Sequence, residues 1–251
     1  MRYSALGFVT AFALIASPAT PGASLGATAL SYRISVAGIG IGDLDLAITR
    51  DAGRYAVSAE GSYRVMFWSG AIRGEAEGLI EADGPAPERF EISDDDDDPS
   101  RTRIDFDPTR GPVAWQRIPP APAEWTAGRL DLRDDHLAGA LDPISALTSL
   151  AFVGAPVSPD ALCDRELRVF TGFVVFRLDL DGVRSRSSDR VSCNTRYRPL
   201  SGHRADSSSV DRLSVPDAIE ASFLAHPSGT WVPERISLPT RVGTLALSID
   251  D

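Results

Sequence analysis

Lysine is absent from this chain, and all 25 of its basic residues are arginine. The absence excludes Schiff-base catalysis, phosphate binding by a P-loop lysine and Ser-Lys hydrolysis, because each of these needs a lysine amine. Arginine used alone is typical of codon bias in a GC-rich bacterial genome. The basic residues therefore remove several reaction classes and point to none.

Histidine is scarce, and its three copies are His136, His203 and His226. None lies at metal-ligand spacing from another or from a free cysteine, so the sequence predicts no zinc site. His136 follows the acidic pair Asp134 and Asp135, which would suit a carboxylate-oriented base. A polar loop histidine is the simpler interpretation.

Serine-nucleophile motifs are missing as well. Ser145 and Ser201 stand outside the G-x-S-x-G context that marks a nucleophile elbow. A triad assembled from distant residues stays open, because such triads are defined by geometry. We predict no catalytic, cofactor-binding or metal-binding residue, and no cofactor.

The chain has only two cysteines, Cys163 and Cys193. An even count in an exported protein predicts one structural disulfide, which on the chain-entropy account contributes roughly 3–4 kcal/mol. The C-x-x-C spacing of redox-active pairs is missing, so free or redox-active thiols are the less favoured alternative.

Long hydrophobic runs are limited to one, from Ala5 to Ala16. At about 12 residues it suits the apolar region of a signal peptide and is too short for a membrane span, which needs roughly 20. Small-residue cleavage patterns follow at 17–19 and 27–29, and the second is favoured because a strand pattern begins at Leu30. We predict a signal peptide over residues 1–29, with an uncleaved anchor as the alternative, and a periplasmic or extracellular location.

The remaining residues, 30–251, are expected to form a single domain with no stable membrane span after cleavage. No fixed-period repeat or low-complexity linker divides them, and about 220 residues suffice for one large β domain. The full sequence has a formal net charge of −10. Because this charge repels phosphate backbones and anionic lipid headgroups at long range, neither nucleic acid nor anionic lipid headgroups are expected partners.

Alternation of apolar and polar residues dominates from Leu30 onward and predicts strands. Turn signals separate the strands, for example at Asp51-Ala52-Gly53, Gly84-Pro85-Ala86-Pro87 and Asp181-Gly182. Eleven or so strands joined by short turns imply a mainly antiparallel sheet that curls or closes to limit its edges. The expected fold class is all-β, a curved sheet or barrel-like domain.

One short helix is expected near residues 143–152. Asp142 is a candidate N-cap and Pro143 occupies the first helical position. Apolar residues then recur at helical spacing, at Ile144, Leu147 and Leu150. A helix beside a curved apolar sheet would suit a plug or lid over a ligand cavity.

The segment Pro119–Asp135 carries three prolines, which bar a central strand, and is interpreted as a long surface loop. Trp125 lies within it and, if exposed, would suit contact with a sugar ring, a lipid tail or a protein partner. Core packing or loop anchoring is the preferred role for the tryptophans, which are Trp68, Trp115, Trp125 and Trp231.

Five consecutive aspartates, Asp94 to Asp98, are expected at a hairpin tip, because adjacent carboxylates repel one another inside a sheet. A weak divalent-cation site is the alternative, although the spacing is not the alternate D-x-D-x-D of a calcium loop. Arg101 and Arg103 stand near two further aspartates and are interpreted as cross-strand surface pairs, each worth at most about 1 kcal/mol.

Several of these stretches together resemble a bacterial family. Asp142-Pro143-Ile144-Ser145-Ala146-Leu147 is similar to the "DPLSAL" helix start of the domain-of-unknown-function family DUF3108. The stretches that continue the likeness are Phe170-Thr171-Gly172, where the family commonly has aspartate in place of Thr171, Cys193 through Tyr197, Pro199-Leu200-Ser201-Gly202, and Val232 to Gly243. Tyr32 and the bend at 37–42 extend it over most of the chain. The resemblance implies an exported, mainly antiparallel β domain with no established activity, so no catalytic residue carries over.

These features predict a non-catalytic periplasmic module that binds or carries a hydrophobic or envelope-derived ligand. The alternative is a structural or interaction protein of the cell envelope that binds another protein through its acidic face or Pro-rich loop. A glycan or lipid hydrolase is the least favoured class, because it would need ionisable groups gathered in one cleft. A core filled solid with side chains would contradict the carrier hypothesis.

Overall fold

The computed structural model describes residues 25–65, 68–96, 98–152, 157–227 and 229–250, with the side chains of residues 25, 26 and 68 outside this set. Thirteen strands of the described residues form one antiparallel sheet. The strands are β1 (Leu25–Val36), β2 (Ile39–Asp51), β3 (Arg54–Val65), β4 (Trp68–Glu81), β5 (Gly84–Asp94), β6 (Ser100–Asp107), β7 (Gly111–Ile118), β8 (Asp164–Phe170), β9 (Val175–Arg186), β10 (Arg190–Ser201), β11 (Glu220–Ala225), β12 (Trp231–Thr240) and β13 (Gly243–Ile249).

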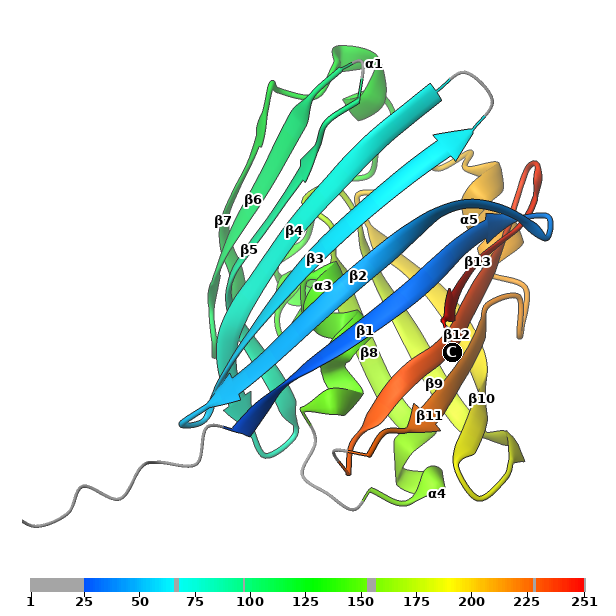
Figure 1. Ribbon diagram of the computed structural model, residues 1–251. Helices are drawn as coiled ribbons and strands as arrows, with labels where there is room; N and C mark the ends of the chain where they lie inside the picture. Colours follow the sequence, from blue (N-terminus) through cyan, green and yellow to red (C-terminus); the bar gives the residue numbers. More distant parts are fainter. Residues whose placement is uncertain (1–24, 66–67, 97, 153–156, 228, 251) are drawn as a thin grey trace, which may run out of the picture.

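The sheet coils into a nearly closed, barrel-like shell (Figure 1). Strand β1 pairs with both β2 and β13, which joins the N-terminal strands to the C-terminal ones. Strands β7 and β8 stand at the two ends of the strand order, and no pairing joins them within the described residues. We call the gap between them the seam. The predicted all-β, barrel-like fold is confirmed, with thirteen strands where about eleven were expected.

The two ends of the shell differ, and we name them from Figure 1. The upper end carries the β1–β2, β3–β4, β5–β6 and β12–β13 turns, and the lower end carries the β2–β3, β4–β5 and β6–β7 turns. Alternation along each strand gives one face toward the interior and one toward solvent, as period-two patterns predict.

Short helices occupy the connections between strands. They are α1 (Ala123–Thr126), α2 (Asp134–Leu137), α3 (Pro143–Thr148), the 3-10 turn η1 (Ser149–Ala151), α4 (Pro159–Leu162) and α5 (Ser208–Leu213). The helix predicted near 143–152 is confirmed as α3 continued by η1. The segment interpreted as a loop, 119–135, also contains α1 and the start of α2, which have four residues each and no side-chain cap, so no periodic pattern marks them. None of the described helices is long and apolar enough to cross a bilayer.

Helix α3 lies inside the shell, where it touches β3, β4, β5, β8 and β12 (Figure 1). Gly74 of β4 leaves room for it, since a Cβ there would stand 2.6 Å from Ile144 Cδ1. Around Ile144 the inner wall contributes buried apolar side chains, among them Leu46, Val57 and Phe90. We call residues 142–152 the plug, because they fill the lower interior.

Two predicted turns are wrong, and each lies at a bulge. Strand β5 begins at Gly84, so Pro87 sits within a strand, opposite a register shift at Gly78 of β4. A bulge is one of the places where a sheet tolerates proline. Strand β9 continues through Gly182, whose φ of +84° accompanies a register shift between β9 and β10. The chain does break at Gly172, since β8 ends before it and its φ is +89°.

Strand β1 begins at Leu25, five residues before the strand start that the sequence predicts. Thr28 is buried and pairs with Ile48 of β2. Cleavage at the favoured pattern, 27–29, would remove this part of β1, whereas the other pattern, 17–19, lies outside the described residues. The position of the cleavage site stays a prediction.

Candidate functional site at the upper end of the shell

The plug begins at Asp142, a fully buried carboxylate at the start of α3. The backbone N–H groups of Ile144 and Ser145 donate to its Oδ1, both at 2.9 Å. Its Oδ2 has no hydrogen-bond partner among the described residues. Burial raises the pKa of Asp142 to about 6, against the opposing effect of the hydrogen bonds from Ser145 and Ile144. The predicted N-cap is confirmed, and it places a titratable group in the interior.

Two polar side chains of the plug, those of Ser145 and Thr148, have hydrogen-bond partners, whereas Ser149 Oγ has none among the described residues. Ser145 Oγ lies 2.7 Å from the hydroxyl of Tyr55 on β3, and Thr148 Oγ1 donates to the Ile144 carbonyl at 2.8 Å. The ring of Tyr55 also packs on Phe152, with centroids 4.5 Å apart. Ser145 therefore joins the plug to the wall, and its side chain also acts to lower the pKa of the neighbouring Asp142 carboxyl.

The two cysteines connect the segment after the plug to strand β10. Cys163 follows α4 and Cys193 lies on β10; their Sγ atoms are 1.94 Å apart and their Cα atoms 5.3 Å apart. Both are buried in a second apolar cluster with Leu162 and Phe223. The pair predicted from the cysteine count thus stands at disulfide distance, and it bridges across β9.

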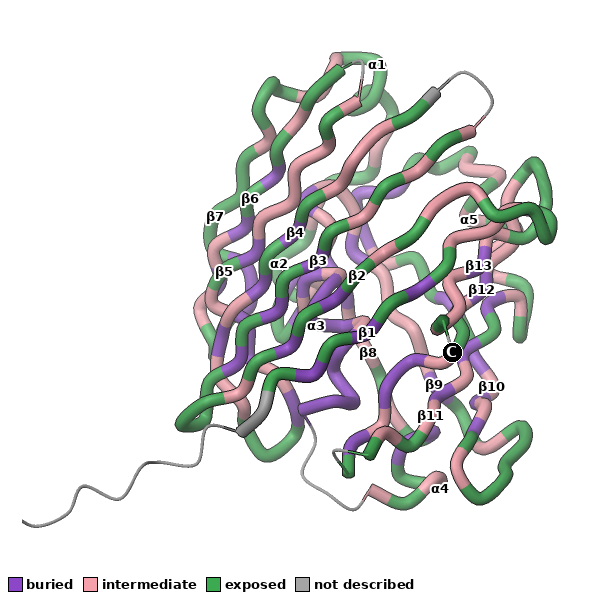
Figure 2. The backbone as a smooth tube through the Cα atoms, in the orientation of Figure 1, coloured by how far each residue is buried: buried purple, intermediate pink, exposed green. Residues whose placement is uncertain are grey.

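Above the plug, the inner wall is apolar but only half-buried. Register places Leu44 and Ile72 in one inner row, and Ile34 and Tyr63 in the next row toward the upper end. These side chains are half-buried, whereas Leu46, one row lower, is almost fully covered. Figure 2 shows the same change along β2 to β6, where buried segments gather toward the lower part of the strands.

An inward side chain on a nearly closed sheet can be half-exposed only if solvent reaches the interior. No plug residue covers the upper rows in the way that Ile144 covers Gly74, so the upper end forms a mouth. We define the mouth as the inner-facing residues Ile34, Leu44, Tyr63, Ile72 and Leu247. Its wall is apolar, and it is the one place in the described interior where such a surface meets solvent across several strands.

Glycines widen this end of the shell. Gly42, Gly61 and Gly70 stand in the mouth rows and place no side chain inside. Tyr63 lies flat across Gly70, where a Cβ would stand 2.5 Å from the tyrosine hydroxyl. A depression of about 660 Å³ opens at the rim beside Gly42, Tyr63 and Gly70.

The aspartate run forms one side of the rim. Strand β5 ends at Asp94 and β6 begins at Ser100, so the predicted hairpin tip is confirmed, with Asp97 outside the described residues. Asp96 Oδ2 accepts a 3.4 Å hydrogen bond from Tyr63. Burial, and then the charge of Asp96, raises the pKa of Asp94. In the described part of the chain, no group of three or more His, Cys, Asp or Glu side chains is arranged to hold a metal ion.

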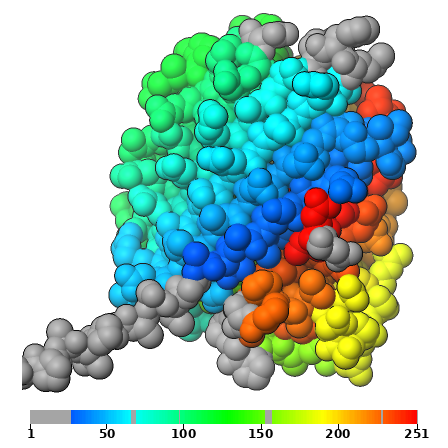
Figure 3. Space-filling view, viewed as in Figure 1, coloured from blue at the N-terminus to red at the C-terminus, as the bar shows by residue number. Residues whose placement is uncertain are grey.

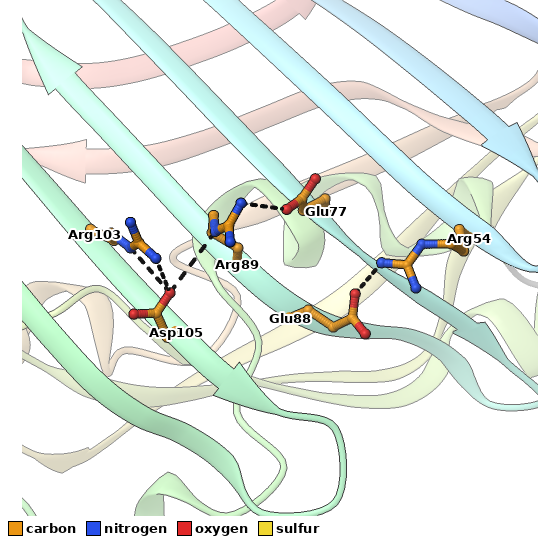
Figure 4. A network of polar contacts seen from close by, with 6 residues as sticks. All are labelled: Arg54, Glu77, Glu88, Arg89, Arg103 and Asp105. Carbon is orange, nitrogen blue, oxygen red and sulfur yellow. Dashed lines mark hydrogen bonds and ion pairs between the residues drawn. The ribbon is translucent and has the colours of Figure 1, made fainter.

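Figure 3 shows the outer face of the sheet closely covered by side chains, and many of those on β3 to β6 are charged. Arg89 lies 2.9 Å from Glu77 and 4.0 Å from Asp105, and Arg103 donates to Asp105 at 2.8 Å (Figure 4). Arg101 pairs with Glu91 on the neighbouring strand. Arg101 is thus a cross-strand surface pair as predicted, whereas Arg103 pairs along its own strand.

These charges border a groove of about 370 Å³ on the outer face, which we interpret as a solvated surface. Its arginines are already paired, and its side chains are about half-exposed. Exposed pairs of this kind contribute at most about 1 kcal/mol each.

The buried histidine, His203, lies at the upper end, with Nε2 3.1 Å from the Val175 carbonyl and 3.4 Å from the Tyr197 hydroxyl. Burial lowers the pKa of His203, and the nearby charge of Arg129 lowers it further. Ser201 is also buried, but no hydrogen bond joins its Oγ to His203 or to any other described residue. The two side chains do not form a nucleophile and base.

The other histidines lie elsewhere. His136 Nε2 is 4.0 Å from Asp135 Oδ2, and that carboxylate is held by Arg133. His226 lies in the β11–β12 turn, where its N–H donates to the Thr230 carbonyl. The three histidines therefore occupy three separate regions, as their sequence spacing indicates.

Two tryptophans are exposed. Trp125 on α1 is 47 % exposed, and Trp115 on β7 is 41 % exposed and meets Phe170 edge-on across the seam. The indole N–H of Trp231 donates to the Val157 carbonyl at 3.2 Å, which anchors a loop. The side chain of Trp68 lies outside the described set.

Sequence reasoning did not locate the mouth. The available signal was the recurrence of glycine at inner positions, 42, 61 and 70, among alternating apolar residues. No protein-family model, no curated protein and no solved structure matches this chain. The resemblance to DUF3108 therefore stays a prediction.

Proposed function

We propose that this protein holds an apolar ligand in its mouth and acts as a carrier without chemistry. The observation that supports this most is the half-exposure of inward apolar side chains above the plug, at Leu44 and Ile72. Each side chain left in this state forgoes on the order of 1 kcal/mol of burial energy, which an alkyl chain in the mouth would recover.

The plug limits where such a ligand lies. Its buried residues pack with the lower wall in one apolar cluster, so the lower interior is filled. The ligand would occupy the upper rows only and reach solvent at the rim depression near Tyr63. A chain held in this way would be partly enclosed and free to leave without unfolding of the shell.

Uptake of a fluorescent fatty-acid probe tests the proposal. We expect the wild type to bind the probe, and Ile72→Asp to weaken binding at least tenfold, because a carboxylate in the apolar wall repels an alkyl chain. The matched control is Ala47→Asp, which adds the same charge at an exposed outer-face position that does not line the rim depression. Absence of uptake by the wild type, or an equal loss in both variants, would contradict the proposal.

An envelope interaction protein is the second candidate, and the edge strand β7 favours it. Val113, Trp115 and Ile118 are 50 %, 41 % and 55 % exposed, on a strand whose second edge has no strand partner within the described residues. Unpaired edges with apolar side chains invite added strands. Crosslinking from position 115 in the native cell would give a discrete partner if this function holds, and only self-adducts or none if it does not.

We propose that the protein works in the periplasm after export. Since residues 27–29 belong to β1 and Thr28 is buried, cleavage within the 27–29 pattern would damage the sheet. We therefore expect cleavage after Ala19, and N-terminal sequencing of the exported protein should begin at Thr20. A sequence that begins at Leu30 would show that β1 forms without its first residues.

A further inference from the structure

Three arginines converge around α1 at the upper end. The Arg117 guanidinium lies over the Trp125 ring, 5.2 Å from its centroid. Arg129 Nε donates to the Trp125 carbonyl at 2.5 Å, and Arg204 Nη1 lies 3.4 Å from the Glu124 carbonyl. The backbones of Arg129 and Arg204 form an antiparallel bridge. We call these three residues the arginine cluster.

The cluster forms fewer close ion pairs than the arginines of the outer face, although the charge of Arg117 does act on Asp94. Arg117 and Arg129 form no ion pair within the described residues, although the chain has 35 acidic residues for 25 arginines. Arg204 meets only Asp206, at 3.5 Å, and the Asp206 side chain is 82 % exposed. Each guanidinium has five N–H donors, and backbone carbonyls accept hydrogen bonds from only some of them. Donors and positive charge are therefore left over at one place on an acidic protein.

The arginine cluster borders the apolar interior. Arg117 faces inward on β7, in the same row as Thr102 and Ile92. Arg129 stands over the Phe173 ring, 5.8 Å from its centroid, and donates to the Gly202 carbonyl at 2.9 Å. A ligand in the upper interior would thus have its apolar part against the wall and its end near these guanidinium groups.

We propose that the arginine cluster binds the anionic headgroup, a carboxylate or a phosphate, of an amphiphile whose alkyl chain lies in the mouth. This inference rests on the proposed carrier function and adds the class of ligand. Arginine binds both anions through paired N–H donors, and such bonds are about twice as strong as neutral ones.

The aspartate run lies on the same side of the rim as β7, because β6 pairs with β7. Asp94, Asp95, Asp96 and Asp98 surround the β5–β6 tip, and the charge of Arg117 acts to lower the pKa of Asp94, against the larger effect of burial. These carboxylates repel an anionic headgroup, so the proposal places the headgroup against Arg129 and Arg204.

The test compares two probes that share one alkyl chain, oleate and oleyl alcohol. We expect the wild type to bind oleate at least tenfold more tightly than the alcohol. In the double variant Arg129→Gln and Arg204→Gln, this preference should fall below threefold while affinity for the alcohol stays the same. Arg241→Gln is the control, since this arginine also lies at the upper end but donates to Ser208. Thermal unfolding of each variant shows whether the fold is kept.

Each outcome decides between the two proposals. Equal binding of oleate and oleyl alcohol by the wild type would overturn the headgroup site and leave the carrier function standing. Failure of both probes to bind would overturn the carrier function and, with it, the site. Inorganic phosphate serves as a third arm: if it displaces oleate at equal concentration, the cluster is a free-anion site and the amphiphile is the wrong ligand class.

Discussion

Replacing both Cys163 and Cys193 with serine is expected to lower the free energy of unfolding by about 3–4 kcal/mol. The bond closes a loop with a sequence separation of 30, and its loss returns that chain entropy to the unfolded state. Both positions are buried in an apolar cluster, so the serine hydroxyls would add a smaller cost of their own. Urea unfolding at one pH measures the change.

Reduction of the wild type by a thiol reagent is the control, because it breaks the same bond without adding hydroxyls. We expect reduction to account for most of the change seen in the double serine variant. A loss below 1 kcal/mol in both experiments, or two thiols that react with a labelling reagent in the native exported protein, would show that the cysteines are not bonded.

Asp142→Asn is expected to remove a large part of the pH dependence of stability between pH 5 and pH 8. The folded pKa of Asp142, about 6, stands above its unfolded value near 3.9 because burial disfavours the charged form. The folded protein then binds this proton more tightly than the unfolded chain. The resulting stabilisation is present in full below pH 3.9 and is lost as the pH rises through about 6.

A displacement of this size corresponds to roughly 2–3 kcal/mol in total, of which about half is lost by the wild type between pH 5 and pH 8 and none by the asparagine variant. Asparagine keeps an Oδ1 acceptor for the Ile144 and Ser145 N–H groups, so the start of α3 should stay capped. Unfolding free energies at pH 5 and pH 8 measure the difference. The exposed residue Asp131, changed to asparagine, is the control and should follow the wild type. Parallel curves for Asp142→Asn and the wild type would contradict the buried position of this carboxylate.

Much of the fold was predictable because it depends on local patterns. Alternation marked most strands, and Asp142-Pro143 marked the start of the helix that became the plug. The wrong turns at 84–87 and 181–182 share one cause. Proline and glycine signal a turn locally, but a bulge in their own strand, β5 or β9, let the sheet keep them.

The candidate site was less predictable, because its residues come from distant parts of the chain. Ile34 lies beside Leu247 through the β1–β13 pairing, and Arg129 meets Arg204 through a single bridge. No spacing rule connects such residues. The sequence singled out Trp125, the aspartate run and His203 at this end, but it did not bring them together, and the exposure of Trp125 was only one of two alternatives.

The sequence by itself determined the all-β class and the helix start at Asp142, because alternation and capping depend on residues close together in the chain. It also determined the pairing of the cysteines, because the chain has only two. Only the tertiary structure decided that the plug stops below Ile72, that β7 and β8 stay apart, and that three arginines gather around α1 at the upper end. These features depend on how the shell closes, and closure is set by long-range register such as Tyr32 with Ile249.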